Sequence, residues 1–192
     1  MACIRDLCST SLGTTARWQI ICPAPERTNA YLQAASPYEL YGQVIARWEQ
    51  DYEGDTDLVG DTLSLLWAAR RGLSEAELLQ ALGTDTQPLP RAAWSPLFLA
   101  MADALISRGG LLTFAHDFLR TAAREAYLPS ETHQQQVHLR LADYFQQQPA
   151  APRRTDELPW QLTEARAWDR LSTLLKDPAF FAEAWARDQF EV

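Results

Sequence analysis

Residues 108–120 read RGGLLTFAHDFLR, and this stretch decides how the middle of the chain folds. Gly109 and Gly110 favour a tight turn, and the apolar residues that follow them favour a strand. Together they predict a small β-hairpin with the two glycines at its tip. Asp117 is the predicted N-cap of a helix that runs from there to about residue 127. Between strand and helix stands His116, the residue of this stretch that packing explains least.

Helices are predicted on the N-terminal side of this hairpin. Capping boxes occur at Ser36 with Glu39 and at Ser74 with Glu77, and Gly83 is the predicted C′ residue of the second of these helices. The predicted helices span residues 36–52, 58–71, 74–82 and 95–106. Because the last three of these helices precede a hairpin in this order, the pattern indicates a winged-helix arrangement.

Helical patterns also continue to the C-terminal side of the hairpin. Ser130 is the predicted N-cap of a helix to about residue 148, Pro149–Pro152 is a linker, and Asp177–Pro178 begins a last helix. The predicted fold class is therefore mainly α, a winged-helix domain with a small β-hairpin followed by α-helical repeat-like hairpins. The predicted division is an irregular leader or remnant of a preceding domain at 1–35, a helix plus winged-helix domain at 36–128, and a repeat-like region at 129–192.

Composition narrows the classes of partner. The 192 residues are 47% hydrophobic, enough for a proper core, and carry a formal net charge of -8. Such a charge gives no general attraction to phosphate backbones or anionic lipid. No apolar run approaches the length of a membrane span, and the charged start of the chain does not resemble a signal peptide. We therefore expect a cytoplasmic protein that binds neither nucleic acid nor membrane.

The sequence offers no catalytic constellation and no metal site. Its one lysine, Lys176, has no glycine near it, so a P-loop is excluded. His133 and His138 are five residues apart, off a shared helix face, and are expected to be two exposed helix histidines rather than metal ligands. We predict no catalytic residue and no metal ligand, and that the chain is not an enzyme by itself.

Two further groups of residues have a structural and a functional interpretation. Arg70 and Arg71 at the end of a predicted helix are expected to interact with the helix dipole rather than with a ligand. The tryptophans are expected to pack in the core or between repeats rather than to form a binding platform. These tryptophans are Trp67, Trp160, Trp168 and Trp185.

Three long stretches carry a family resemblance. They are LSLLWAARRGLSEAELLQALG at 63–83, LPRAAWSPLFLAMADALISRGGLLTFAHDFLRTAA at 89–123 and DELPWQLTEARAWDRLSTLLKDPAFF at 156–181. Over residues 38–187 the chain resembles the winged-helix and following helical region of NACHT-type STAND NTPases, especially their nephrocystin-3-like branch, without the nucleotide-binding core.

This resemblance implies a role for His116. In that family a winged-helix histidine contacts the β-phosphate of bound ADP, and Ala115-His116-Asp117 looks like the Met-His-Asp motif, with alanine in place of methionine. The resemblance therefore implies that His116 senses the ADP β-phosphate and that Asp117 supports it. It also implies that this chain binds no cofactor by itself. ADP or ATP would bind only where a NACHT-type NTPase core, in the same or another chain, lies next to it.

Three functional hypotheses follow. The leading one is a regulatory module of a STAND (NACHT) signalling NTPase, which couples the nucleotide state of an adjacent core to protein partners bound by the helical tail. The alternative is a nucleotide-independent helical scaffold for protein interactions, with Trp160 to Trp185 in the binding surface. The third is a winged-helix DNA-binding protein. It is disfavoured because the predicted helix from Pro96 to Ile106 has no Arg, Lys, Asn or Gln to reach bases or phosphates.

Overall fold

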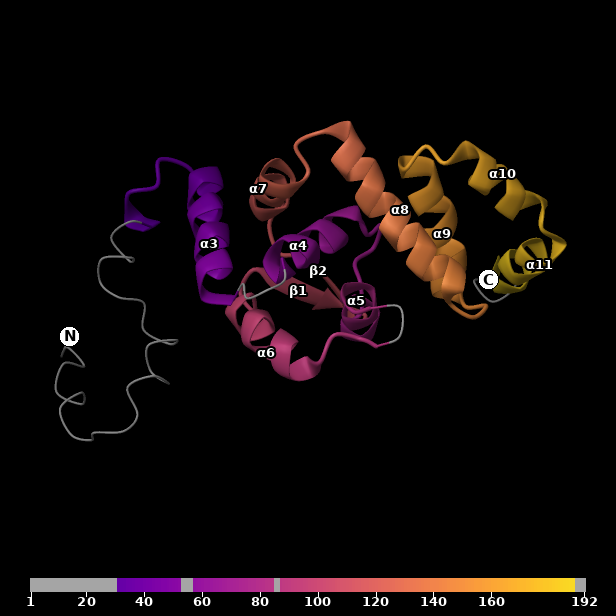
Figure 1. Ribbon diagram of the computed structural model, residues 1–192, viewed down its shortest axis with the longest axis horizontal. Helices are drawn as coiled ribbons and strands as arrows, with labels where there is room; N and C mark the ends of the chain where they lie inside the picture. The colour runs from indigo at the N-terminus through magenta and orange to yellow at the C-terminus, as the bar shows by residue number, and fades with distance from the viewer. Residues whose placement is uncertain (1–30, 53–56, 85–86, 189–192) are drawn as a thin grey trace.

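The computed structural model describes residues 31–52, 57–84 and 87–188, and it is mainly α-helical with one small β-hairpin (Figure 1). The helices before the hairpin are α3 (Pro37–Tyr52), α4 (Leu58–Ala68), α5 (Glu75–Leu82) and α6 (Arg91–Ala100). The hairpin is β1 (Leu105–Arg108) and β2 (Leu111–Phe114). After it come α7 (Asp117–Tyr127), α8 (Glu131–Gln147), α9 (Pro152–Glu164), α10 (Trp168–Lys176) and α11 (Pro178–Asp188). The predicted leader at 1–35 lies almost wholly outside the described residues.

Two predicted helix starts, at Ser36 and at Ser74, are confirmed by their hydrogen bonds. At α3 the backbone N–H of Glu39 donates to the hydroxyl of Ser36, although the Glu39 carboxylate accepts from Ala35 rather than from Ser36. At α5, Ser74 and Glu77 form both bonds of a capping box. These bonds satisfy amide groups that have no partner within the helix, which fixes where each helix begins.

The hairpin has the predicted tip. Gly109 and Gly110 both have positive φ, 58° and 81°, as a two-residue hairpin turn requires. The strands are antiparallel, with Leu105 opposite Phe114 and Arg108 opposite Leu111. Leu73 adds a short bridge, because its amide and carbonyl both bond to Leu112.

The helix predicted at 95–106 was wrong in position. α6 begins at Arg91 and encloses Pro96, and the chain from Leu105 onward is already strand β1. The Ser95 hydroxyl donates to the Arg91 carbonyl within the helix instead of capping its start. Only Trp94 and Leu97 of α6 are buried. Gly83 also differs from prediction, since its backbone is extended (φ −76°) rather than left-handed.

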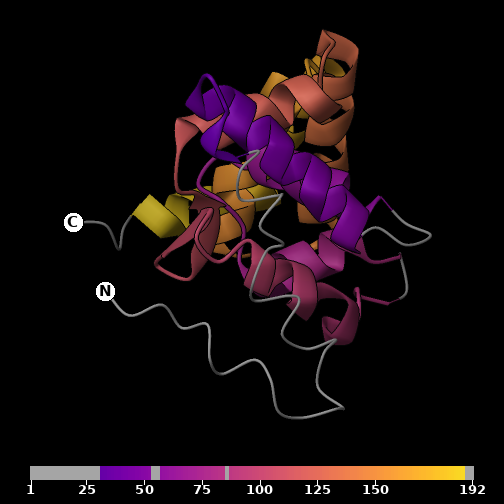
Figure 2. The ribbon, with the colours of Figure 1, turned by 90° about the vertical axis from the view of Figure 1, so that its left-hand side faces the viewer.

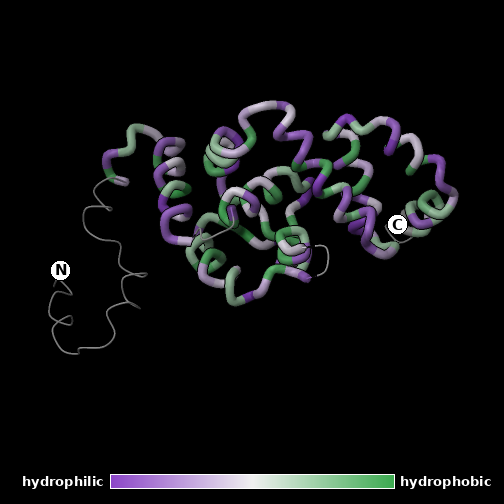
Figure 3. Tube along the Cα trace, in the orientation of Figure 1, coloured by the Kyte–Doolittle hydropathy of each residue, from purple (hydrophilic) through white to green (hydrophobic). Residues whose placement is uncertain are grey.

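A single cluster of buried apolar residues extends from α3 to α9, centred on α4. Most residues of α4 are buried, because it is packed by α3, α7, α8 and the hairpin (Figure 1). Hydrophobic colours accordingly run along this central helix, and purple, hydrophilic residues are frequent on the outer helices (Figure 3). Seen from the side, α3 crosses the face of the helices behind it (Figure 2). The tail α8–α11 continues from this core as successive packed helices.

Candidate functional site

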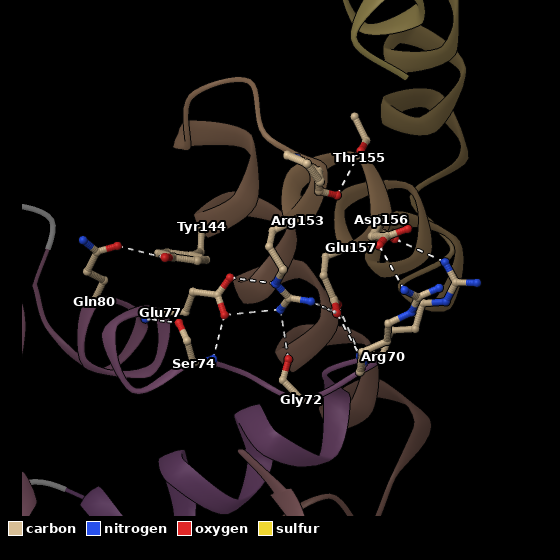
Figure 4. Close-up of polar contacts among 12 residues, drawn as sticks. Arg70, Gly72, Ser74, Glu77, Gln80, Tyr144, Arg153, Thr155, Asp156 and Glu157 are labelled. Carbon is tan, nitrogen blue, oxygen red and sulfur yellow. Dashed lines mark hydrogen bonds and ion pairs between the residues drawn. The ribbon is translucent and has the colours of Figure 1, made fainter. Parts of the chain in front are cut away.

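A buried polar network joins the tail to the core. Glu157 and Gln161 lie one turn apart on α9, and both side chains are fully buried, at 0% exposure. The Glu157 carboxylate accepts the backbone N–H groups of Arg70 and Arg71 at 3.2 and 3.3 Å, just past the end of α4 (Figure 4). The amide of Gln161 donates to the carbonyl of Ala68 at 3.0 Å. Backbone groups that α4 leaves without helical partners are thus satisfied by side chains of α9.

Arg153 completes this network. Its guanidinium donates to the carboxylates of Glu77 and Glu157 and to the carbonyl of Gly72 (Figure 4). Burial opposes the charge, but the hydrogen bond that Arg153 donates to Glu77 and the negative charges of Glu77 and Glu157 leave the pKa of Arg153 raised. One arginine therefore ties α9 to the start of α5 and to the turn before it, which holds the tail in a defined position.

The histidine prediction was wrong for His138. Its side chain is 5% exposed and its Nδ1 lies 2.7 Å from Oε1 of Gln161, with the ring 5.5 Å from that of Trp67. Desolvation by burial lowers the pKa of His138, although the hydrogen bond to Gln161 works in the other direction. His133 is exposed as expected and contacts the N-cap hydroxyl of Ser130. The two histidines do not meet at a site.

The last two helices expose large apolar side chains. We call the set Trp168, Leu175, Phe181 and Trp185 the tail surface. Their exposed fractions are 56%, 58%, 64% and 60%. Trp168 and Leu175 are seven residues apart on α10 and therefore share a face, and the rings of Phe181 and Trp185 stack at 6.3 Å on α11. No residue of α10 is buried.

The packing role predicted for the tryptophans was therefore wrong for most of them. Trp168 and Trp185 belong to the exposed tail surface, and Trp160 is 37% exposed. Only Trp67 is packed against the core cluster as expected. Helical spacing alone could not separate these cases, because an outer helix of a stack has the same periodicity as an inner one.

His116 and Asp117 lie together at the start of α7, both exposed. The predicted N-cap was wrong, since His116 holds that position and Asp117 is the first helical residue. The His116 side chain makes no capping bond, and its ring lies 6.3 Å from that of Tyr41. No observation tests the phosphate-sensing role of these two residues, which stays a prediction.

Glu157 and Gln161 are the residues that sequence reasoning missed. A usable signal was present, because both share one helix face with the apolar residues Leu158 and Leu162. Buried polar side chains need hydrogen-bond partners, so these two residues predict a buried polar contact between this helix and another part of the chain. Arg70 and Arg71 follow the end of α4 at Ala68, and their backbone amides bind the carboxylate of Glu157, a role that was not predicted.

The described part of the chain has neither a candidate metal-binding cluster nor a helix that could span a membrane. Residues 31–52, 57–84 and 87–188 contain no group of three or more His, Cys, Asp or Glu side chains that could hold a metal ion. Within the same residues, no helix combines the length and the apolar character that crossing a membrane would need.

Comparison with known proteins points to tetratricopeptide repeat (TPR) proteins. The chain is 30% identical over 152 residues to a TPR repeat-containing protein of Dictyostelium discoideum, a match that covers 78% of this chain and 9% of that protein. It is 28% identical over 185 residues to tetratricopeptide repeat protein 41 of Mus musculus, covering 78% of this chain and 14% of the relative. The Rattus norvegicus protein of the same name is 28% identical over 184 residues, with 77% and 14% covered. The chain thus spans less than a sixth of these relatives.

No family model and no solved structure matches the chain. The relatives correct the resemblance drawn from the sequence, because they are named as TPR repeat proteins and not as NACHT or STAND NTPases. The identification of the chain as a STAND NTPase fragment was wrong, and so was the NACHT core as its partner. The prediction that the chain is not an enzyme by itself is confirmed by the same relatives, whose names describe repeat proteins.

Proposed function

We propose that this chain is a helical protein-interaction module that works without nucleotide, and that its tail surface binds an amphipathic helix of a partner protein. The observation that carries the proposal is the exposure of Trp168, Leu175, Phe181 and Trp185 on two consecutive helices. Tryptophan and other aromatic residues are enriched at interfaces and among residues that dominate binding energy. Similarity to TPR proteins supports the same class, because stacked helical repeats form extended binding surfaces.

A helix is the occupant that the stacking of the tail favours. α9 packs on α8, α10 packs on α9, and α11 packs on both α9 and α10. Each earlier helix of this series buries apolar side chains against a neighbour, for example Leu158 and Leu162 of α9. On α10, no other described part of the chain buries the face that carries Trp168 and Leu175. A further helix against α10 and α11 would continue the packing that the tail already uses.

We also propose how the fold is organised in more detail, as a winged-helix part followed by a repeat-like part. The order α4, α5, α6 and hairpin, with the Leu73 bridge to Leu112, supports a winged-helix arrangement within residues 36–128. The successive packing of α8 to α11 supports a repeat-like region at 129–192. The buried network around Glu157 would then fix the angle at which the second part presents the tail surface to a partner.

Site-specific photo-crosslinking tests the partner and its chemistry. A photoreactive phenylalanine analogue replaces Phe181 in one variant and Phe118, an exposed phenylalanine on α7, in a matched control. After irradiation in cells, the cross-linked peptides are identified by mass spectrometry. We expect position 181, and not position 118, to cross-link to a segment with helical amphipathic spacing. Cross-links from position 181 only to a second copy of this chain would show self-association instead and contradict the proposal.

Affinity for the mapped segment gives the quantitative test. The segment is made as a synthetic peptide, and its binding to the chain is measured by calorimetry. Phe181→Ala and Trp185→Ala should each weaken binding by about tenfold or more, as expected for aromatic anchors. Adding ADP or ATP with magnesium should leave the affinity unchanged. A clear nucleotide dependence would argue against a nucleotide-independent module.

A further inference from the structure

The end of α4 carries a second feature that packing alone does not require. The guanidinium of Arg120, from α7, lies 6.0 Å from the centre of the Trp67 ring, and that of Arg70 lies 5.4 Å from the centre of the Trp160 ring. We call these four residues the arginine–tryptophan strip. Both pairs meet at residues 67–70, where Arg120 also donates to the Trp67 carbonyl at 3.4 Å.

The strip is held by the polar network already described. Gln161, the neighbour of Trp160, donates to the carbonyl of Ala68, the neighbour of Trp67. This bond fixes α9 against the end of α4, so that the two arginine–tryptophan pairs come from three helices but share one junction. None of the four residues belongs to the tail surface, and the inference therefore goes beyond the proposed function.

Both arginines are exposed, and neither has a carboxylate partner within the described residues. The acidic neighbours on α9 are already engaged, since Asp156 pairs with Arg71 and Glu157 pairs with Arg153. Arg70 makes one long bond, 3.5 Å, to the Asp156 carbonyl. Each guanidinium has five N–H donors, so most of the donors of Arg70 and Arg120 face solvent.

A purely structural explanation covers part of this arrangement. Arg120 stands at the C-terminal end of α4, where a cation interacts favourably with the helix dipole. This accounts for its bond to the Trp67 carbonyl. It does not account for the position of a second guanidinium without a carboxylate partner, that of Arg70, over the ring of Trp160.

We propose that the arginine–tryptophan strip binds an acidic segment of a partner protein. Carboxylates of that segment pair with Arg70 and Arg120 in the bidentate geometry that arginine favours, and an apolar residue between them rests against Trp67 or Trp160. Stacking on the tryptophans already holds each guanidinium in place, so less side-chain freedom is lost on binding. A protein segment fits better than a nucleic acid, because tight binding of a phosphate backbone needs a row of cations and the strip offers two. The formal net charge of -8 opposes both ligands, but it opposes a short acidic segment less than a long phosphate backbone.

Fluorescence anisotropy with defined probes tests this proposal on the purified chain. The probe is a labelled peptide in which glutamates surround single leucines, and its control has glutamine in place of every glutamate. We expect salt-sensitive binding of the glutamate peptide only. The double variant Arg70→Gln with Arg120→Gln should weaken it by about tenfold or more. Arg108→Gln, which removes one positive charge from an exposed arginine of β1, should leave binding unchanged.

Trp160→Leu adds a test of the stacking, because it keeps apolar bulk but removes the ring beneath Arg70. It should weaken binding of the glutamate peptide. The unfolding midpoint is measured for every variant and should stay close to that of the parent protein. Equal binding of the two peptides, or parent-like binding by the double arginine variant, would overturn the proposal. Arginine-dependent binding of labelled oligothymidylate tighter than that of the glutamate peptide would also overturn it.

Discussion

Nε of Arg153 donates a 2.9 Å hydrogen bond to Oε1 of Glu77, a residue 76 positions earlier in the chain. Glu77 already closes the capping box of α5 by accepting the backbone N–H of Ser74. The same carboxylate thus starts one helix and anchors another. Arg153 also pairs with the buried carboxylate of Glu157, so one guanidinium takes part in two ion pairs at the contact between α9 and the core.

Replacing this arginine should be costly. Arg153→Ala leaves the Glu157 carboxylate buried without its cation and removes a donor from the Gly72 carbonyl, so we expect a loss of about 3 kcal/mol in the free energy of unfolding. The control Arg170→Ala breaks an exposed ion pair with Asp143 and should lose less than about 1 kcal/mol. Urea unfolding of both variants measures the difference. Similar losses in the two variants would show that the buried ion pair stabilises the chain no more than the exposed one does.

His138 should make stability fall in mild acid. Its pKa is lowered in the folded chain, chiefly by desolvation, from an ordinary value of 6.5. The unfolded chain therefore binds a proton first as the pH falls below about 6.5, which favours unfolding by up to about 1.4 kcal/mol per pH unit. Above that pH His138 is neutral in both states and adds no slope.

The comparison with two histidine variants isolates this effect. His138→Gln should flatten the dependence of unfolding free energy on pH between 6.5 and the folded pKa, while His133→Gln, on the exposed part of the same helix, should leave it as in the parent chain. The charged groups that act on His138 are Glu157, Glu164 and Arg120, and both variants retain all three. Parent-like slopes in both variants would show that His138 is not the source of the acid sensitivity.

Local signals in the sequence predicted much of the fold, and tertiary placement explains what they missed. Capping boxes and the Gly109–Gly110 turn act over a few residues, so the starts of α3 and α5 and the hairpin were predicted correctly. The Ser95–Pro96 signal misled, because proline is also tolerated inside a helix when the surrounding packing holds it. Which face of an outer helix is covered depends on neighbours far along the chain, and so the exposure of Trp168 and Trp185 did not follow from periodicity.

Two glycines in different surroundings should respond in opposite directions to alanine. Gly72 has φ +91°, and an added Cβ would meet the carbonyl oxygen of Leu112, so Gly72→Ala should destabilise the chain by about 2 kcal/mol. Gly42 lies inside α3 with nothing near its Cβ position, so Gly42→Ala should stabilise by about 0.5–1 kcal/mol. Thermal unfolding of the two variants checks both signs. Destabilisation by Gly42→Ala would indicate that this face of α3 is covered in solution.

Phe180 and Phe181 are consecutive on α11 but face opposite surroundings. Phe180 is 4% exposed and lies beneath the guanidinium of Arg154, whereas Phe181 is 64% exposed on the tail surface. Phe180→Ala should therefore reduce the free energy of unfolding by about 3 kcal/mol, as for a buried phenylalanine, and Phe181→Ala by less than about 0.5 kcal/mol. Chemical denaturation of the isolated chain measures both. If Phe181→Ala proved as costly as Phe180→Ala, its ring would already be buried, and the tail surface would not be free to take a partner helix.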